Sequence, residues 1–311
     1  MKKRLLLTTS LILGITLWNI QIFAQETASD SAKQEEPKAW TTGGGAGIDF
    51  AQLALINPRV GAGTNRIGFG GLINVFANYK KNKFAWDNSG TLQLAAQRIG
   101  GKDNPFEKSL DILRLTSRAS FRPGTGKLYA AIEADIYTLM LTTYEGNVLK
   151  PEDPDENPIA KFFSPVQIMI SPGLEYKASD HLSFLFSPVS LKEIYVGNDS
   201  IAALNVHGNE LGKNDFLQLG SNLKARYSNV LLKQRLSLTS ALDLYSNYLQ
   251  SPENIDVFWT NDFGLNIVKN LSVNVVTQLF YDDDVNVQVD DKLIPAVNFT
   301  EALLIKYNLI F

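Results

Sequence analysis

The sequence predicts an all-β fold, a transmembrane antiparallel up-and-down β-barrel of twelve strands. Three observations predict it. The last segment, residues 297–311, alternates apolar and polar side chains and stops on Phe311. Eleven earlier stretches alternate in the same way, and the connections between them are short and long in turn. This combination is typical of barrels from the outer membrane of Gram-negative bacteria.

The alternating stretches have about the ten residues that a spanning strand needs. In the clearest of them, Phe69 and Ile73 lie on one face and Gly70 and Asn74 on the other. Such strands face lipid on one side and an aqueous interior on the other, which gives the period of two. The predicted strands are residues 42–53, 66–80, 83–98, 108–122, 127–142, 165–177, 181–190, 215–228, 231–247, 255–268, 271–282 and 296–311.

The connections provide a second line of evidence. Five are short (81–82, 124–125, 178–180, 228–230 and 268–270) and six are longer (54–65, 99–107, 143–164, 191–214, 248–254 and 283–295). Outer-membrane barrels have short periplasmic turns and longer extracellular loops, so we expect both termini on the periplasmic side. A soluble β-sandwich also has many strands, but it explains neither this loop alternation nor one apolar face on nearly every strand.

The N-terminus has the composition of a signal peptide. Residues 2–4 are basic, residues 5–22 are largely apolar, and Ala24 offers a small residue for cleavage. An uncleaved membrane helix is the alternative, but a polar stretch follows at once and no second apolar span exists. The predicted parts are a signal peptide at 1–24, a disordered periplasmic lead-in at 25–40 and the barrel at 41–311.

Composition excludes several classes of protein. Without the first 24 residues, 26 basic side chains stand against 32 acidic ones, a net charge near −6. An acidic chain does not favour nucleic acid as a partner. The hydrophobic fraction of 45% without a long apolar run after residue 22 argues against a helical membrane protein. With no cysteine, the chain forms no disulfide and carries no lipoprotein anchor.

Aromatic side chains gather on outward positions next to the short turns. Tyrosine and tryptophan prefer the headgroup level of a membrane, so an aromatic girdle is expected at this rim. Its predicted members are Tyr79, Phe84, Trp86, Phe121, Tyr176, Tyr227, Tyr307 and Phe311.

Three stretches carry a resemblance to a known family: FANYKKNKFAWDN at 76–88, LYSNYLQSPENIDV at 244–257 and LFYDDD at 279–284. They resemble a family of Bacteroidetes outer-membrane proteins described only as a domain of unknown function. The resemblance extends from about Trp40 to Phe311. It implies an outer-membrane β-barrel, and it implies no catalytic or binding residue.

Charged residues on inward positions are the candidate lumen residues: Arg114, Arg118, Glu133, Asp135, Lys224, Arg226, Arg235, Asp243 and Asp262. A two-residue turn at 124–125 would place Arg114 opposite Asp135 and Thr116 opposite Glu133. Opposite charges facing each other across strands stabilise a sheet by a few tenths of a kcal/mol. Two interpretations stay open: a charged constriction that filters solutes, or charges that pair and fill the interior.

Acidic loop residues are candidate ligands for Ca²⁺ or Mg²⁺ shared with lipopolysaccharide phosphates. They are Asp282, Asp283, Asp284, Asp290 and Asp291. The EF-hand pattern is absent, and solvated loop acids are the simpler interpretation. We expect no cofactor and no resident metal, because two distant histidines without cysteine do not form a zinc site.

The positions of the two histidines give little support to an enzyme hypothesis. His181 lies beside Asp180 at a short turn, and His207 lies in a long loop near Glu210. Neither lies on an outward strand face, where a Ser–His hydrolase of the outer membrane would need it. A catalytic triad is recognised by its geometry, so a hydrolase stays a distant third hypothesis after two others.

The leading functional hypothesis is a narrow passive channel or a solute-binding, porin-like barrel. The alternative is a structural or interaction barrel whose extracellular loops contact lipopolysaccharide or a partner protein. The expected partners are outer-membrane lipid, lipopolysaccharide, and the barrel-assembly machinery acting on the C-terminal strand. The sequence does not indicate which solute passes or binds.

Overall fold

The computed structural model describes residues 39–53, 66–151, 153–205, 207, 209–281, 286–289 and 292–310. The predicted signal peptide, all but the end of the lead-in, Phe311 and the five candidate loop acids lie outside these residues. The strands are β1 Trp40–Leu53, β2 Arg66–Lys81, β3 Phe84–Ile99, β4 Glu107–Phe121, β5 Leu128–Thr138, β6 Val166–Lys177, β7 Leu182–Tyr195, β8 Asp215–Leu231, β9 Leu236–Asn247, β10 Asp256–Val268, β11 Leu271–Tyr281, β12 Asn286–Val289, β13 Lys292–Pro295 and β14 Asn298–Ile310.

Twelve of these strands form one closed antiparallel ring, which confirms the predicted fold class and strand number. Each strand from β1 to β11 pairs with the next, and β14 closes the ring by pairing with both β11 and β1. The closing pairs run from Gly45 opposite Ile310 to Asp49 opposite Lys306. Because β14 ends and β1 begins at the same rim, both ends of the barrel lie on the side of the short turns.

The connections alternate in length as expected. Those at the first rim have 2, 6, 4, 4 and 2 residues, and those at the second rim have 12, 7, 27, 19, 8 and 16. Several predicted boundaries were wrong. β5 ends at Thr138, β7 continues to Tyr195, and β9 begins only at Leu236. The last long connection contains a small hairpin, β12–β13, where the sequence predicted a plain loop.

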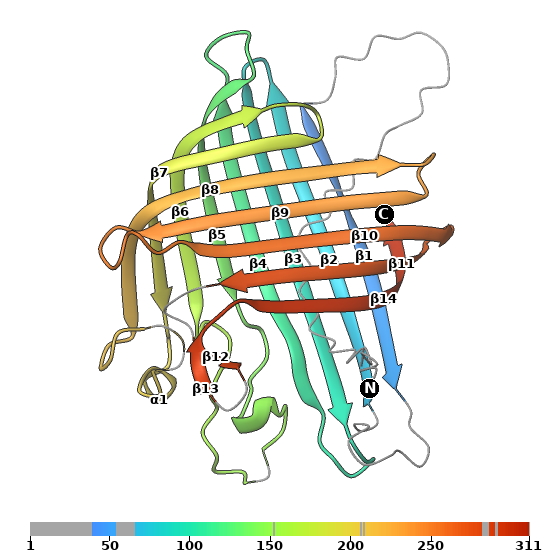
Figure 1. Ribbon diagram of the computed structural model, residues 1–311, viewed down its shortest axis with the longest axis vertical. Helices are drawn as coiled ribbons and strands as arrows, with labels where there is room; N and C mark the ends of the chain where they lie inside the picture. Colours follow the sequence, from blue (N-terminus) through green and yellow to red (C-terminus); the bar gives the residue numbers. More distant parts are fainter. Residues whose placement is uncertain are drawn as a thin grey trace, which may run out of the picture.

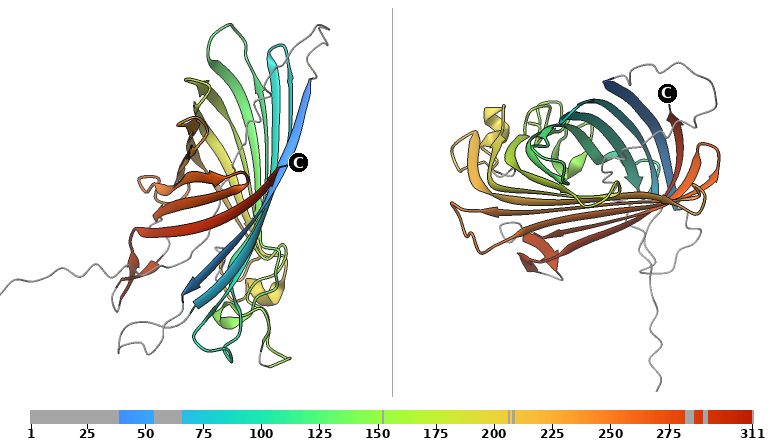
Figure 2. Two further views of the ribbon diagram at one scale, coloured as in Figure 1. Left: turned by 90° about the vertical axis from the view of Figure 1, so that its right-hand side faces the viewer. Right: turned by 90° about the horizontal axis from the view of Figure 1, so that it is seen from above.

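The ring is flattened into two walls that cross steeply. β2–β5 run down one wall, and β8–β11 with β14 run across them in front (Figure 1). Seen from above, the two walls curve toward each other (Figure 2). On one side they enclose a core of buried apolar side chains, which we call the apolar core: Leu72, Ala95, Leu110, Val276 and Leu304, with Ile112 packed against it.

The core draws on both walls: Leu72, Ala95 and Leu110 come from β2, β3 and β4, whereas Val276 and Leu304 come from β11 and β14. The core therefore connects β2–β4 with β14 and β11, which lie on the other side of β1 in the ring. The burial of apolar side chains between the walls stabilises this contact. On this side the interior of the barrel is filled.

The outer face has the opposite character, because large apolar side chains are exposed on it. Along β2, β4 and β5, residues such as Ile73, Leu115 and Ile132 each have nearly half of their surface exposed. Further outward apolar residues are Val75, Ile170, Leu174, Phe186, Leu191, Leu217, Phe263 and Ile305. A monomer rarely exposes so much contiguous apolar surface to water, so this face is built to contact an apolar medium.

The two longest loops pack together at the second rim. The 139–165 loop contains a 3-10 turn, η1 Glu145–Asn147, and the 196–214 loop contains α1 Asp199–Ala202. Gly197 N donates to the carbonyl of Phe163 at 2.9 Å, and the ring Nε2 of His207 lies 2.6 Å from the carbonyl oxygen of Ile159. Burial lowers the pKa of His207 more than the contact with the Ile159 carbonyl raises it, so burial favours the neutral imidazole. Neither helix in the described residues is long and apolar enough to span a membrane.

Candidate functional site

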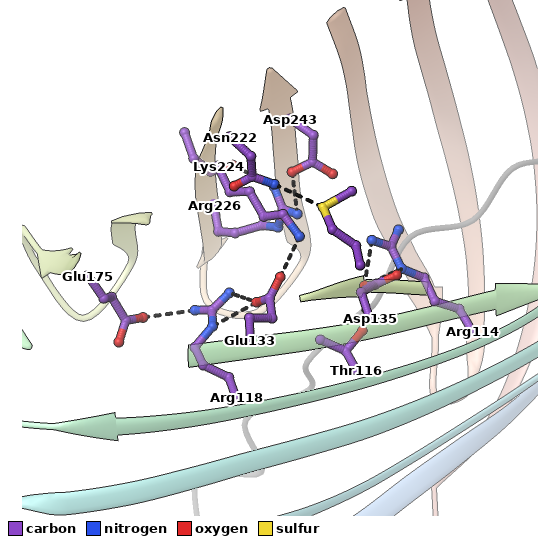
Figure 3. Close-up of polar contacts among 12 residues, drawn as sticks. Arg114, Thr116, Arg118, Glu133, Asp135, Glu175, Asn222, Lys224, Arg226 and Asp243 are labelled. Carbon is purple, nitrogen blue, oxygen red and sulfur yellow. Dashed lines mark hydrogen bonds and ion pairs between the residues drawn. The ribbon is translucent and has the colours of Figure 1, made fainter. Parts of the chain in front are cut away.

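The candidate site lies between the two walls, beside the apolar core. Arg114, Thr116 and Arg118 alternate along β4 with outward residues, and Glu133 and Asp135 do the same along β5. Because side chains in a strand alternate between faces, all five lie on one face of the hairpin and point into the lumen (Figure 3).

The register of this hairpin differs from the prediction by two residues. The connection from β4 to β5 is residues 122–127 and not a two-residue turn. Thr116 therefore lies opposite Asp135, and Arg118 opposite Glu133. A shift of two keeps every side chain on its predicted face, whereas a shift of one would have reversed it.

Arg114 still binds Asp135, from a diagonal position. Its Nε lies 2.9 and 2.8 Å from the two carboxylate oxygens, and its Nη2 lies 2.7 Å from Oδ2. The Thr116 hydroxyl donates to the same carboxylate at 3.0 Å. Such a two-pronged guanidinium–carboxylate contact fixes both side chains in position.

A second group of ionised side chains crosses the lumen. Arg118 donates from Nε to Glu133 at 2.8 Å and from Nη1 to Glu175 of β6 at 2.8 Å. The ammonium of Lys224, from β8, forms an ion pair with the other oxygen of Glu133. Since β8 is three strands away from β5 around the ring, this last contact joins opposite walls. We call Arg118, Glu133, Glu175 and Lys224 the cross-lumen network (Figure 3).

In this conformation, burial favours the interpretation in which the lumen charges pair and fill the interior. Glu133 and Lys224 are each 2% exposed, and Glu175 is equally buried. At this level the charges are paired and fill the interior. Among the described residues, the ends of long side chains fill the lumen at this level.

The other predicted lumen residues have different positions. Arg226 and Asp243 form an ion pair of 2.6 Å between β8 and β9. Asp262 of β10 accepts from Lys306 at 3.1 Å and from Asn274 at 2.6 Å. Arg235 was predicted wrongly: it is exposed and ends the turn before β9.

The Arg235 error has a physical cause. Leu232, Lys233 and Gln234 all have positive φ angles, near 50–69°. Together with Arg235 they form a four-residue turn, and because the sequence offers no glycine there, turn chemistry did not indicate it. β9 consequently begins later than predicted, and Arg235 does not reach the lumen.

Sequence reasoning also missed Glu175, Lys306, Asn222 and Asn274, which are all buried on inward positions. The two-residue alternation could have identified them, because each is a polar residue at a position that faces the inside of the barrel. Glu175 matters most, since it is the second partner of Arg118.

The predicted girdle residues that the structure describes lie on the outer face near the short turns, whereas Phe311 lies outside the described part of the chain. Tyr79 packs between the rings of Trp40 and Phe84, with centroid distances of 5.3 and 6.2 Å. Trp40 extends this cluster and was not predicted. A second band of exposed aromatic residues lies toward the long-loop rim: Phe50, Phe69, Tyr195, Trp259 and Phe299.

The histidines contact backbone carbonyls. His181 Nδ1 lies 3.0 Å from the carbonyl oxygen of Ser228, and His207 contacts Ile159 as described above. Within the described residues, no three His, Cys, Asp or Glu side chains are grouped so that they could hold a metal ion. The candidate cation ligands at 282–284 and 290–291 lie outside those residues and stay a prediction.

One known family model matches part of the chain. Residues 50–144 match the family model described as "Protein of unknown function (DUF3078)". This segment contains β2–β5 and therefore includes Arg114, Arg118, Glu133 and Asp135. No curated protein matches the chain.

The solved structures with some likeness include two outer-membrane channels and the β domain of an autotransporter. The COG4313 outer membrane channel from Pseudomonas putida F1 is 12% identical, with a TM-score of 0.41 over 91% of this chain and 100% of that one. The β domain of the Bordetella autotransporter BrkA is 10% identical, with a TM-score of 0.31 over 87% and 99%. The outer membrane channel DcaP of Acinetobacter baumannii is 10% identical, with a TM-score of 0.29 over 88% and 97%. Because these TM-scores are low, the likenesses carry no argument about function.

Proposed function

We propose that this chain is an outer-membrane barrel that acts as a narrow, porin-like channel, closed in this conformation by the cross-lumen network. The observation that carries the proposal is the inverted distribution of side chains. Large apolar residues are exposed on the outer face, while Glu133, Glu175 and Lys224 are buried inside. A barrel in water would reverse this arrangement, whereas a barrel in lipid requires it.

The membrane part of the proposal predicts a large effect of charge on the outer face. Leu115 lies near the middle of β4 and is 47% exposed. Arginine at the bilayer midplane costs about 2–4 kcal/mol, so Leu115→Arg should lower the free energy of unfolding in lipid vesicles by about that amount. Leu211, in the 196–214 loop, is the matched control because it is 82% exposed and lies outside the strands. Equal urea midpoints for Leu115→Arg and Leu211→Arg would contradict a lipid-facing β4.

The buried charges favour a channel over a barrel with a purely structural role. Replacing a buried ion pair by apolar side chains of similar volume is often neutral or stabilising by about 1–4 kcal/mol. A purely structural interior would thus gain nothing from Glu133, Arg118 and Lys224. Ionisable residues at membrane depth instead mark pathways for solutes or ions.

Planar-bilayer recordings test the channel directly. The double change Glu133→Ser with Lys224→Ser removes both ends of the contact that joins the walls, while Arg118 keeps its partner Glu175. This variant should show larger or more frequent conductance steps than the unchanged protein, because two side chains no longer cross the lumen. The control is Glu210→Ser with Lys213→Ser, an exposed Glu–Lys pair in a loop, which should conduct like the unchanged protein.

A folded double variant that shows no conductance would argue against a channel. In that case the alternative, a barrel whose long loops contact lipopolysaccharide or another protein, would become the better hypothesis. Heat-modifiable migration on gels establishes that each variant is folded before its conductance is judged.

The location completes the proposal. The signal peptide at 1–24 and the lead-in at 25–40 would place the chain in the outer membrane of a Gram-negative bacterium, a member of the Bacteroidetes by resemblance. Both barrel ends would face the periplasm together with the short turns. Outer-membrane lipid, lipopolysaccharide and the assembly machinery would be its partners. We propose no cofactor and no catalytic role.

A further inference from the structure

The inner face of β6–β9 carries a row of buried polar side chains that the ion pairs do not explain. Each has an oxygen atom without a hydrogen-bond partner in the described part of the chain. Ser187 and Ser190 have no exposed surface at all, and Asn222 is almost as deeply buried. We call the row the polar wall; its residues are Ser171, Ser187, Ser190, Gln218, Asn222 and Tyr245.

Strand pairing brings these residues together. Asn222 of β8 lies opposite Ser187 of β7 on one side and opposite Tyr245 of β9 on the other. Ser190 lies opposite Gly220, two residues from Asn222. Irregularities in β6, between Ile170 and Leu174, and in β7, between Ser187 and Ser190, interrupt the ladder here. The unpartnered oxygens therefore form one patch of the lumen.

The Tyr245 ring covers part of this patch and is itself buried. A Cβ atom built on Gly220 would lie 2.8 Å from the hydroxyl oxygen of Tyr245, so the ring rests directly on the glycine. The ammonium of Lys192 lies 5.0 Å from the ring centroid, a cation–π distance. No described residue bonds its hydroxyl group, so the hydroxyl oxygen belongs to the unpartnered atoms of the patch.

Hydration would be favourable at the polar wall and unfavourable at the apolar core. A buried polar atom without a partner is unfavourable, and hydration removes that penalty. Exposing the apolar core, with Leu72 and Leu304, would instead bring apolar surface into water at a cost. When the walls separate, the side with the polar wall is therefore the one that gains from hydration.

We infer that the conducting path runs along the polar wall, between β6–β9 and the β4–β5 hairpin, and avoids the apolar core. The inference rests on the proposed channel function. Hydroxyl and amide groups both donate and accept hydrogen bonds, which suits water and small uncharged hydrophilic solutes. Lys224 and Asp243 form the next inward row beside Asn222 and Tyr245. The path therefore passes the contacts of Lys224 and Asp243, which lie close to Asn222 (Figure 3).

Cysteine accessibility tests the route, and the chain has no cysteine of its own to react. Ser187→Cys places a thiol in the polar wall, and Ala95→Cys places one in the apolar core; both are small substitutions at buried sites. The protein is assembled in lipid vesicles and treated with a charged methanethiosulfonate reagent, and modification is followed by mass spectrometry. Leu211→Cys, in an exposed loop, reports full reactivity.

The expected result is modification of Ser187→Cys about tenfold or more faster than of Ala95→Cys, because thiol reactivity requires access to solvent. In planar bilayers the same reagent should reduce the conductance of Ser187→Cys and leave that of Ala95→Cys unchanged. Ser190→Cys, equally buried in the same wall, repeats the test if Ser187→Cys does not fold.

Faster modification of Ala95→Cys, or no modification at either wall position, would overturn the inferred route. Conductance separates this failure from failure of the proposed function. If the unmodified protein conducts but the polar wall does not react, only the route is wrong. If neither the protein nor its variants conduct, the channel itself is wrong, whereas modification of Ser187→Cys would still establish that the polar wall is hydrated.

Discussion

Replacing Glu133 with glutamine is expected to lower the free energy of unfolding by about 3–5 kcal/mol, the usual effect of breaking a buried ion pair from one side. Glutamine has nearly the same shape, so the effect comes from the lost charge. Lys224 would keep its ammonium at a buried position without the carboxylate that now faces it, and Arg118 would retain only Glu175 as an ion-pair partner in the cross-lumen network. Urea midpoints in lipid vesicles, with heat-modifiable migration as the test of assembly, measure the loss.

Two further variants make this prediction specific. Glu210→Gln, which removes a carboxylate from an exposed loop pair with Lys213, should leave the midpoint unchanged. Combining Glu133→Gln with Lys224→Met should recover much of the lost stability, because neither buried charge is then left without its partner. An unchanged midpoint for Glu133→Gln alone would mean that water reaches Lys224, and the lumen would then be open at this level.

Reversing the charge of Arg114 is expected to prevent assembly of most of the protein. Arg114→Glu would place two carboxylates side by side, because Asp135 now binds Arg114 through both oxygens. Both side chains are mostly buried, 18% and 10% exposed. Like charges in a poorly hydrated site cost several kcal/mol, of the order of the 3–5 kcal/mol for a broken buried pair. The fraction of heat-modifiable protein in the membrane is the measurement.

The exchanged pair provides the control for Arg114→Glu. Arg114→Glu combined with Asp135→Arg restores opposite charges in the same place and should recover much of the assembled fraction. Recovery should be incomplete, because the Thr116 hydroxyl now donates to the Asp135 carboxylate and would face a guanidinium instead. Normal assembly of Arg114→Glu by itself would indicate that water solvates the mismatch.

The strands and their inward faces were predictable because the evidence for them is local. A period of two along residues such as Phe69–Ile73 requires no knowledge of neighbouring strands. For the same reason Arg114, Arg118, Glu133 and Asp135 lie on the predicted face although the register was wrong by two residues. Arg235 was wrong because its turn has positive φ angles at residues that do not favour them.

The pairing of charges was predictable only within one hairpin. Arg114 and Asp135 belong to adjacent strands, so their contact follows from the inward faces alone. Lys224 and Glu133 are 91 residues apart and belong to strands that do not pair. Their contact depends on how far the ring is flattened, which the packing of the apolar core helps to set.

By itself, the sequence determined the class of this protein: twelve spanning strands with alternating short and long connections, an apolar outer face and a polar inner one. These properties depend on the two-residue period and on turn spacing, which are local along the chain. Only the tertiary structure decided that the lumen is filled at the level of Glu133, that Glu175 and Lys224 complete its network, and that the polar wall lies beside it. The distance between the two walls is set by contacts between strands that are far apart in the sequence. It therefore cannot be predicted from any single segment.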